Sequence, residues 1–257
     1  MLAVNMQTSA AQLPMVLRDQ IALVSGASGG LGGAIATALS ERGVRLCLVG
    51  RNLGKLAGLR SQLLGNSGHV YNRSTDLTKE EEIETLRDFV ERQFGRLDIL
   101  VHCAGAIEHG KLASTPISSM DRQYLANVRG PLMLTQAVMP LLRKPCGQVI
   151  FINSSLGITT RAATGYFAAT QHAFKALADT LREEVNTEGV RVTSIFTGRT
   201  ATPRIQSLHA TENRPYQPEL LLQPADVASV VVNALSLPWS AEVTNITIRP
   251  MRKSSGP

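Results

Sequence analysis

The chain has 257 residues, of which 44% are hydrophobic and 18% are charged, so it is long enough to bury one substantial core. The formal net charge of +6 comes from 26 Lys and Arg residues interleaved with 20 acidic residues, without the like-charged run that marks a nucleic-acid surface. Cys47, Cys103 and Cys146 lie far apart with no Cys-x-x-Cys pair, which argues against a disulfide framework and a zinc site. No apolar stretch approaches the length of about 18 residues that a membrane span needs. We therefore expect a cytoplasmic protein without a bound metal, a nucleic-acid partner or a membrane partner.

Short runs rich in Val, Ile and Leu alternate with longer stretches of helical period, which is typical of repeated βαβ units. The predicted strands are Ile21–Ser25, Arg45–Gly50, His69–Ser74, Leu97–His102, Gln148–Asn153, Arg191–Phe196 and Val243–Ile248. This pattern predicts an α/β fold: a Rossmann-type, doubly wound parallel sheet of about seven strands with helices on both faces. We expect one domain over residues 18–250, between a flexible lead-in (1–17) and a flexible tail (251–257).

Three helix starts are indicated by their residues. Thr78-x-x-Glu81 and Ser118-x-x-Asp121 each place a side-chain acceptor before an acid, and Pro224 is typical of a first helical turn. Long apolar helices are expected over about 116–142 and 165–185. Part of their surface faces another subunit of a homodimer or homotetramer, or else the helices only cover the sheet.

A glycine-dense turn links the first predicted strand to a helix. Its sequence is Ser25-Gly26-Ala27-Ser28-Gly29-Gly30-Leu31-Gly32. Glycine lets the backbone approach a pyrophosphate closely, and a helix N-terminus offers N–H groups and partial positive charge. The alternative is an ordinary tight turn, but the strand–turn–helix context favours a dinucleotide site. The residues expected to bind the cofactor here are Gly26, Ser28, Gly29, Gly30 and Leu31.

The end of the second strand indicates which dinucleotide is bound. Leu48-Val49-Gly50-Arg51 has no acid at the place where an NAD site holds the ribose hydroxyls. Arg51 stands there instead, and a guanidinium suits a 2′-phosphate by charge and geometry. NADP(H) is therefore favoured over NAD(H), with a solvated arginine as the alternative.

From about Leu17 to Pro250 the chain resembles the short-chain dehydrogenase/reductase (SDR) family. The glycine string is similar to the family's Thr-Gly-x-x-x-Gly-x-Gly, and Asp76-Leu77 resembles its Asp-Val/Leu pair beside the adenine. Cys103-Ala104-Gly105 stands in for its Asn-Ala-Gly, and the run from Thr197 to Thr202 is similar to its nicotinamide-holding segment. The resemblance implies further cofactor contacts at Asp76, Leu77, Ala104, Gly105, Gln171, Thr200 and Thr202.

The resemblance also implies catalytic positions. Asn127 in Asn127-Val128-Arg129-Gly130 matches the family's catalytic asparagine. Ser154 in Ile152-Asn153-Ser154-Ser155 matches its serine, with Ser155 as a competitor for the same role. The hydroxyl of Ser154 is expected to polarise a substrate carbonyl.

The family's Tyr-x-x-x-Lys motif is absent. The run from Phe167 to Gln171 parallels it, so Phe167 and Gln171 stand in the places of the tyrosine and the lysine. Phenylalanine has no ionisable oxygen, and a neutral amide depresses no neighbouring pKa. Tyr166 is rotated by about 100° on a regular helix and serves as the acid only if the helix unwinds at Gly165. His172 and Lys175 are further ionisable groups on this helix, expected on its solvated face.

The resemblance places a substrate loop at about 203–223. Its polar side chains include Arg204, His209, Arg214 and Tyr216. The arginines recognise a carboxylate or another anion, or are merely solvated.

Three functions stay open for a small-molecule substrate. We favour an NADP(H)-dependent oxidoreductase that acts on a carbonyl or an alcohol, because the glycine turn, Ser154, Asn127 and the substrate loop all persist together. The alternatives are a redox-neutral enzyme, catalysing a cyclisation, isomerisation or elimination, and a non-catalytic dinucleotide-binding protein. Loss of both the tyrosine and the lysine supports these alternatives.

Overall fold

The computed structural model describes residues 17–67 and 69–252, which form one seven-stranded sheet in the order β3-β2-β1-β4-β5-β6-β7. All neighbouring strands in it are parallel. The strands are β1 (Ile21–Ser25), β2 (Arg45–Gly50), β3 (Val70–Ser74), β4 (Ile99–His102), β5 (Gln148–Ser154), β6 (Arg191–Thr197) and β7 (Asn245–Ile248). The predicted fold is confirmed, and each predicted strand is present with ends shifted by no more than a few residues.

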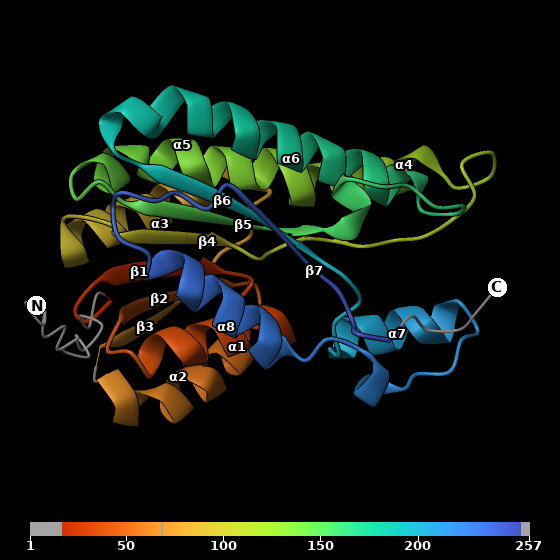
Figure 1. Cartoon of the computed structure of the whole chain (residues 1–257), viewed down its shortest axis with the longest axis horizontal. Helices are drawn as coiled ribbons and strands as arrows, with labels where there is room; N and C mark the ends of the chain where they lie inside the picture. Colours follow the sequence, from red (N-terminus) through yellow and green to blue (C-terminus); the bar gives the residue numbers. More distant parts are fainter. Residues whose placement is uncertain (1–16, 68, 253–257) are drawn as a thin grey trace, which may run out of the picture.

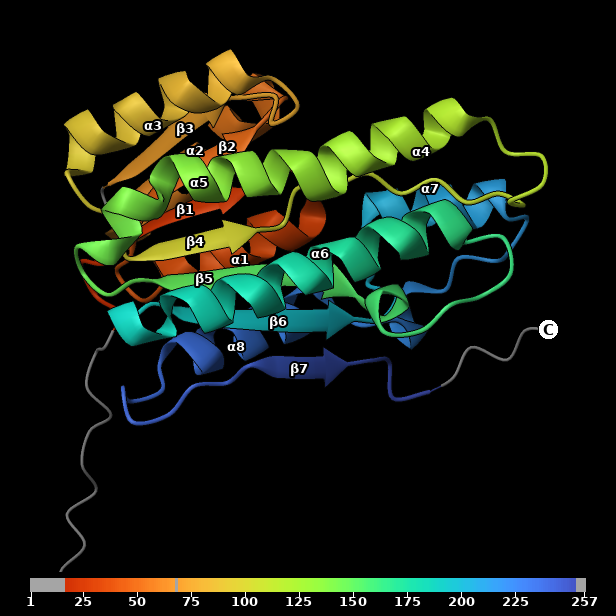
Figure 2. The same cartoon turned by 90° about the horizontal axis from the view of Figure 1, so that it is seen from above.

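Two layers of helices enclose the sheet (Figure 1). The helices on one face are α1 (Gly30–Ser40), α2 (Leu53–Ser67) and α8 (Pro224–Leu235). Those on the other face are α3 (Glu80–Phe94), α5 (Gly130–Arg143) and α6 (Gly165–Val185). Figure 2 shows α4 (Ile117–Tyr124) continuing the line of α5, and α7 (Pro203–Thr211) beyond the carboxyl ends of the strands.

The core has one half on each face of the sheet. On β1, Ala22 and Val24 pack with the α1 side, whereas Ile21 and Leu23 pack with the α3 side. This alternation follows from the two-residue period of a strand. All four of these apolar side chains are buried, as expected for a parallel strand covered on both faces.

Two of the three predicted helix starts are wrong. The residue that precedes α3 is Lys79, with no side-chain cap, so Thr78 lies one residue too early; its hydroxyl donates to Asp76. The helix α4 already begins at Ile117, so Ser118 lies inside its first turn. The prediction at Pro224 is confirmed, since it is the first residue of α8.

Two longer segments also differ from the sequence expectation. The helix expected over about 116–142 contains a π-helical segment, η1 (Leu125–Arg129), between α4 and α5. The segment 203–223, expected as a loop, is helical in its first half because Thr202 accepts the N–H of Ile205 and so caps α7. The helix expected over 165–185 is present as α6.

The borders of the packed domain follow from burial. Leu17, the last residue of the expected lead-in, is 2% exposed and packs in the core, so the domain includes it. The other residues of the expected lead-in, 1–16, lie outside the described residues, as do 253–257 of the expected tail. None of the described helices is both long and apolar enough to cross a membrane.

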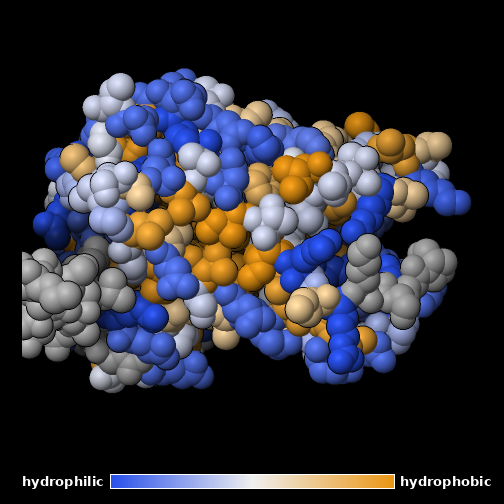
Figure 3. Space-filling view, in the orientation of Figure 1, coloured by the Kyte–Doolittle hydropathy of each residue, from blue (hydrophilic) through white to orange (hydrophobic). Residues whose placement is uncertain are grey.

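An apolar area is visible on the face that carries α8 and β7 (Figure 3). The partly buried side chains here include Val230 of α8 and Ile246 and Ile248 of β7, the strand at one edge of the sheet. The structure contains a single chain, so a homodimer or homotetramer stays a prediction.

The buried imidazole of His102 on β4 predicts a pH-dependent stability. Its Nε2 lies 2.8 Å from Thr135 Oγ1, and burial lowers its pKa to about 3. The unfolded chain takes up a proton on this group below a pH of about 6.5, whereas the folded chain does not, so stability falls as the pH drops toward 3. Between pH 7 and 5 this group removes about 2 kcal/mol from the free energy of unfolding.

Urea unfolding at both pH values measures this loss. In His102→Gln the free energy of unfolding should change by about 2 kcal/mol less between the two pH values than in the wild type. Equal changes in the two proteins would contradict the assignment of a neutral buried imidazole.

Candidate active site

The turn between β1 and α1 lies against the end of β4 without room for a side chain. Gly26 has a φ of +72°, and a Cβ on it would lie 2.7 Å from the backbone nitrogen of Ala104. A Cβ on Gly32 would lie 2.4 Å from the carbonyl oxygen of Gly26. The Oγ of Ser25 accepts the N–H groups of Cys103 and Ala104 at 3.1 and 3.3 Å. The packing of this turn therefore requires glycine at positions 26 and 32.

The N-terminus of α1 faces this turn with open backbone donors. Gly29 precedes the helix and supplies no side-chain cap, and the first turn contains no acidic residue. The first N–H groups of a helix have no intrahelical partner, so those of Gly30 and Leu31 are offered to a ligand. A Cβ on Gly30 would lie 3.2 Å from Cγ2 of Thr202, which brings the segment after β6 beside the turn. Ser28 lies beside Gly50, the last residue of β2.

Arg51 and Asp76 lie at the ends of the neighbouring strands β2 and β3. Arg51 is exposed and has no ion pair within the described part of the chain. Burial acts to raise the pKa of Asp76, but hydrogen bonds from Thr78 and the charges of Arg51 and Lys79 outweigh it, so the pKa lies below its usual value. Leu77 is buried beside Asp76. An exposed guanidinium therefore stands at the place expected for the 2′-phosphate.

At the carboxyl end of β5, Ser154 contacts the buried face of α6. Its N–H donates to Oε1 of Gln171 at 3.1 Å. Its Oγ accepts the N–H of Leu156 at 3.1 Å, which leaves the hydroxyl hydrogen for another group. The Nε2 of Gln171 has no hydrogen-bond partner among the described residues. Phe167, one turn earlier on α6, is 8% exposed.

Asn127 in the π-helical segment η1 ties three parts of the site together. Its Oδ1 accepts the N–H of Ala106 at 2.6 Å, and its Nδ2 donates to the carbonyl oxygen of Ala106 at 2.9 Å. The same Nδ2 donates to Oγ1 of Thr170 on α6 at 3.0 Å. A Cβ on Gly105 would lie 2.9 Å from Oδ1 of Asn127. Asn127 therefore fixes the loop after β4 against α6.

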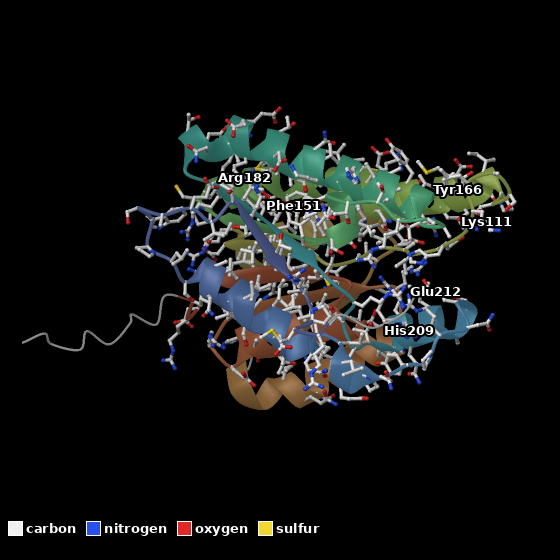
Figure 4. All side chains as sticks on the ribbon, turned by 45° about the vertical axis from the view of Figure 1, so that its right-hand side comes forward. Lys111, Phe151, Tyr166, Arg182, His209 and Glu212 are labelled. Atoms are coloured by element: carbon white, nitrogen blue, oxygen red, sulfur yellow. The ribbon has the colours of Figure 1, made fainter. Side chains whose placement is uncertain are left out.

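The other candidates on α6 make contacts elsewhere. The hydroxyl of Tyr166 donates to the carbonyl oxygen of Thr115 at 3.2 Å, and α6 is a regular helix from Gly165, without the unwinding that would turn Tyr166 inward. The Nδ1 of His172 lies 2.9 Å from the carbonyl oxygen of Ala168 in its own helix. Lys175 forms an ion pair with Asp179. Figure 4 shows Tyr166 on α6 with Lys111 on the loop near it, and Glu212 and His209 at α7 below them.

The remaining expected contacts lie after β6. The side chains of Thr200 and Thr202 are 4% and 9% exposed, and Thr200 forms a bridge with Leu222. Burial raises the pKa of the Cys103 thiol to about 12, so this residue is a neutral thiol and not a nucleophile. A surface cavity of about 680 Å³ lies on the outer side of α6, where its lining includes Leu112, Ala169 and His172. None of the expected cofactor-binding or catalytic residues lines it.

Sequence reasoning missed His109 and Glu212. The Nδ1 of His109 lies 2.7 Å from Oε1 of Glu212. The same carboxylate accepts two hydrogen bonds from Nη2 of Arg199, at 2.9 Å on Oε1 and 2.6 Å on Oε2. The ring of His109 packs 6.0 Å from that of Phe167, centroid to centroid. The signal for His109 is its place just after β4, where open α/β sheets bind ligands. Glu212 has no such local signal.

Comparison with known proteins places these residues in a family. The short chain dehydrogenase family model matches residues 20–213. An uncharacterized oxidoreductase of Staphylococcus aureus is 34% identical over 237 residues, which cover 92% of this chain and 99% of that protein. One of Staphylococcus saprophyticus is 30% identical, with 91% and 99% covered.

Solved structures of other proteins have a similar fold. The alcohol dehydrogenase of the archaeon Thermococcus sibiricus, complexed with 5-hydroxy-NADP, has a TM-score of 0.83 and 25% identity, with 93% of this chain and all of that chain covered. A serine dehydrogenase complexed with NADP+ has a TM-score of 0.84 and 25% identity, with 92% and 98% covered. A short chain dehydrogenase of Shigella flexneri complexed with NADP has a TM-score of 0.81 and 29% identity, with 90% and 98% covered. The chain therefore belongs to the short-chain dehydrogenase/reductase family.

Proposed function

We propose that this chain is an NADP(H)-dependent oxidoreductase acting on a carbonyl or alcohol substrate, with Phe167 and Gln171 in the places of the family's tyrosine and lysine. The observation that carries the proposal is the turn after β1, where Gly26 and Gly32 leave no room for a Cβ beside the open N-terminus of α1. Such a surface fits a pyrophosphate. The relatives named oxidoreductases and the similar structures with NADP or NADP+ support it.

Each part of the site has a role in this proposal. The N–H groups at the start of α1 bind the pyrophosphate, and Arg51 binds the 2′-phosphate. The Nε2 of Gln171 donates to a ribose hydroxyl, without the positive charge of a lysine. The hydroxyl of Ser154 donates to the substrate oxygen. When bound, the nicotinamide supplies or accepts the hydride.

The direct test is a titration of NADPH fluorescence with the purified protein, followed by NADPH absorbance in a panel of carbonyl substrates. We expect NADPH to bind and to be oxidised by at least one carbonyl compound. NADPH binding without turnover of any substrate would favour the redox-neutral and the non-catalytic alternatives. Absence of binding would contradict the proposal as a whole.

Removing the charge of Arg51 tests the choice of nucleotide. A charge-assisted hydrogen bond is worth about 1.5–3 kcal/mol, so Arg51→Ala should raise the Kd for NADPH about 10- to 150-fold. The Kd for NADH should change little, because NADH has no 2′-phosphate. The control is Arg42→Ala, which removes an exposed arginine near the end of α1. Equal losses for the two nucleotides would exclude Arg51 as the phosphate ligand.

Adding a methyl group at Gly26 tests the packing of the turn. Gly26→Ala introduces both a contact of 2.7 Å with backbone and strain at a φ of +72°. It should destabilise the fold by at least about 1 kcal/mol and weaken NADPH binding at least about tenfold. The matched control Gly58→Ala lies in α2 with open space around it and should stabilise the fold by about 1 kcal/mol. Thermal unfolding and NADPH titration measure both effects; undiminished NADPH affinity in Gly26→Ala would place the nucleotide elsewhere.

A further inference from the structure

An imidazole packs against the ring that stands in the place of the tyrosine. The rings of His109 and Phe167 lie 6.0 Å apart at 54° to each other. Phe167 belongs to α6, whereas His109 comes from the loop that follows β4 and is held by Asn127 through Ala106. Phenylalanine has no proton to exchange, whereas the imidazole of His109 beside it is ionisable.

A carboxylate orients the imidazole from the opposite side. Glu212, at the end of α7, lies 2.7 Å from Nδ1 of His109. Burial acts to raise the pKa of Glu212, but hydrogen bonds from Arg199 and His109 outweigh it, so the pKa lies below its ordinary value and the group is a carboxylate. A carboxylate only accepts hydrogen bonds, which assigns the hydrogen of the pair to Nδ1.

The second ring nitrogen has no partner. The Nε2 of His109 is buried and makes no hydrogen bond within residues 17–67 and 69–252. The side chains of His109 and Glu212 are only 11% and 19% exposed, so the pair is shielded from solvent. Unpartnered buried side-chain atoms occur elsewhere in the described chain too, as at Nε2 of His209, so what distinguishes His109 is its contact with Phe167. With Nδ1 held by Glu212, Nε2 is the atom that can exchange a proton with a ligand.

We propose that His109, oriented by Glu212, is the catalytic residue that exchanges a proton with the substrate oxygen; this inference rests on the proposed function. In reduction, the hydride supplied by bound NADPH forms the new C–H bond, and the carbonyl π electrons move to oxygen. The imidazolium Nε2–H gives its proton to that oxygen and forms the O–H bond. The neutral imidazole takes its next proton from water after the product has left the site. Alcohol oxidation follows the reverse course, with neutral Nε2 as the base.

The groups around His109 agree with this role. Glu212 stays ionised and stabilises the imidazolium, as the carboxylate of a catalytic triad does. Two positive charges lie beside the carboxylate of Glu212. Arg199 forms an ion pair with it, and Nη1 of Arg214 lies 4.0 Å from its Oε2. From α6 the facing side chain is the apolar Phe167. Tyr166 and Cys103 do not compete, since the hydroxyl of Tyr166 is engaged with Thr115 and Cys103 is a neutral thiol.

Turnover of the variants His109→Gln and Glu212→Gln tests this role. General acid–base catalysis contributes about 100- to 10,000-fold, so His109→Gln should lower kcat for carbonyl reduction by that factor while the Kd for NADPH stays within about twofold. Glu212→Gln should lower kcat by a smaller factor. The control His172→Gln, on the outer face of α6, should leave kcat unchanged. Undiminished kcat in His109→Gln would overturn the proposal.

A rescue separates proton transfer from packing. Adding Phe167→Tyr and Gln171→Lys to His109→Gln should restore turnover at least about tenfold, because the family's acid and its lysine are then present. Failure of this rescue together with a lower Tm for His109→Gln would assign His109 to packing and overturn its catalytic role.

A measurement on the ligand-free protein does not depend on turnover. Nitrogen-15 NMR of histidine-labelled protein should show the hydrogen of neutral His109 on Nδ1, and Glu212→Gln should shift that tautomer balance. A hydrogen on Nε2 would overturn the proposed orientation.

If the wild type binds NADPH but reduces no carbonyl, the proposed function fails, and the proposed role of His109 in proton transfer fails with it. If wild-type turnover survives in His109→Gln, the role of His109 fails alone.

Discussion

The close contact between the turn after β1 and the end of β4 is the constraint on which the site depends. The hydroxyl of Ser25 accepts from the backbone after β4, and Gly26 fits there only because it has no Cβ. The contact sets the entrance of α1, whose N-terminus faces the proposed pyrophosphate. It also sets the direction in which the chain leaves β4, through Gly105, toward Asn127 and His109. The nucleotide and the proposed proton donor are therefore positioned from the same point of the sheet.

The polar contacts of α6 explain how the proposed site keeps its shape with Phe167 and Gln171 in the places proposed for the tyrosine and the lysine. Gln171 accepts from Ser154 at the end of β5, and Thr170 accepts from Asn127, so α6 keeps its place against the sheet. The carboxylate of Glu212, at the end of α7, accepts hydrogen bonds from the loops after β4 and β6 and so holds these segments together. In this account the family's geometry for hydride transfer is retained, while the proton is handled by a side chain of a different element.

Local patterns predicted the strands, the glycine turn and α6, because runs of Val, Ile and Leu and a strand–turn–helix glycine string depend on neighbouring residues only. The predicted cap at Thr78 failed because α3 begins at Glu80, which leaves Lys79 and not Thr78 in the capping position. The π-helical segment around Asn127 has no local signal. The pairing of His109 with Glu212 has none either, because the two partners are 103 residues apart in the chain, although the place of His109 after β4 is a usable signal for that residue alone. The helix α7 had a usable signal in Thr202 and Pro203, a cap followed by a first-turn proline.

The central claim is that the chain uses its nucleotide for hydride transfer and does not merely hold it. NADPH that carries deuterium at both C4 positions of the nicotinamide tests this claim directly, with mass spectrometry of the products from a panel of carbonyl compounds. The account predicts an alcohol that carries one deuterium on its former carbonyl carbon, formed at a rate that falls in His109→Gln. Deuterium that stays on the nucleotide throughout the panel, while NADPH is bound, would contradict it.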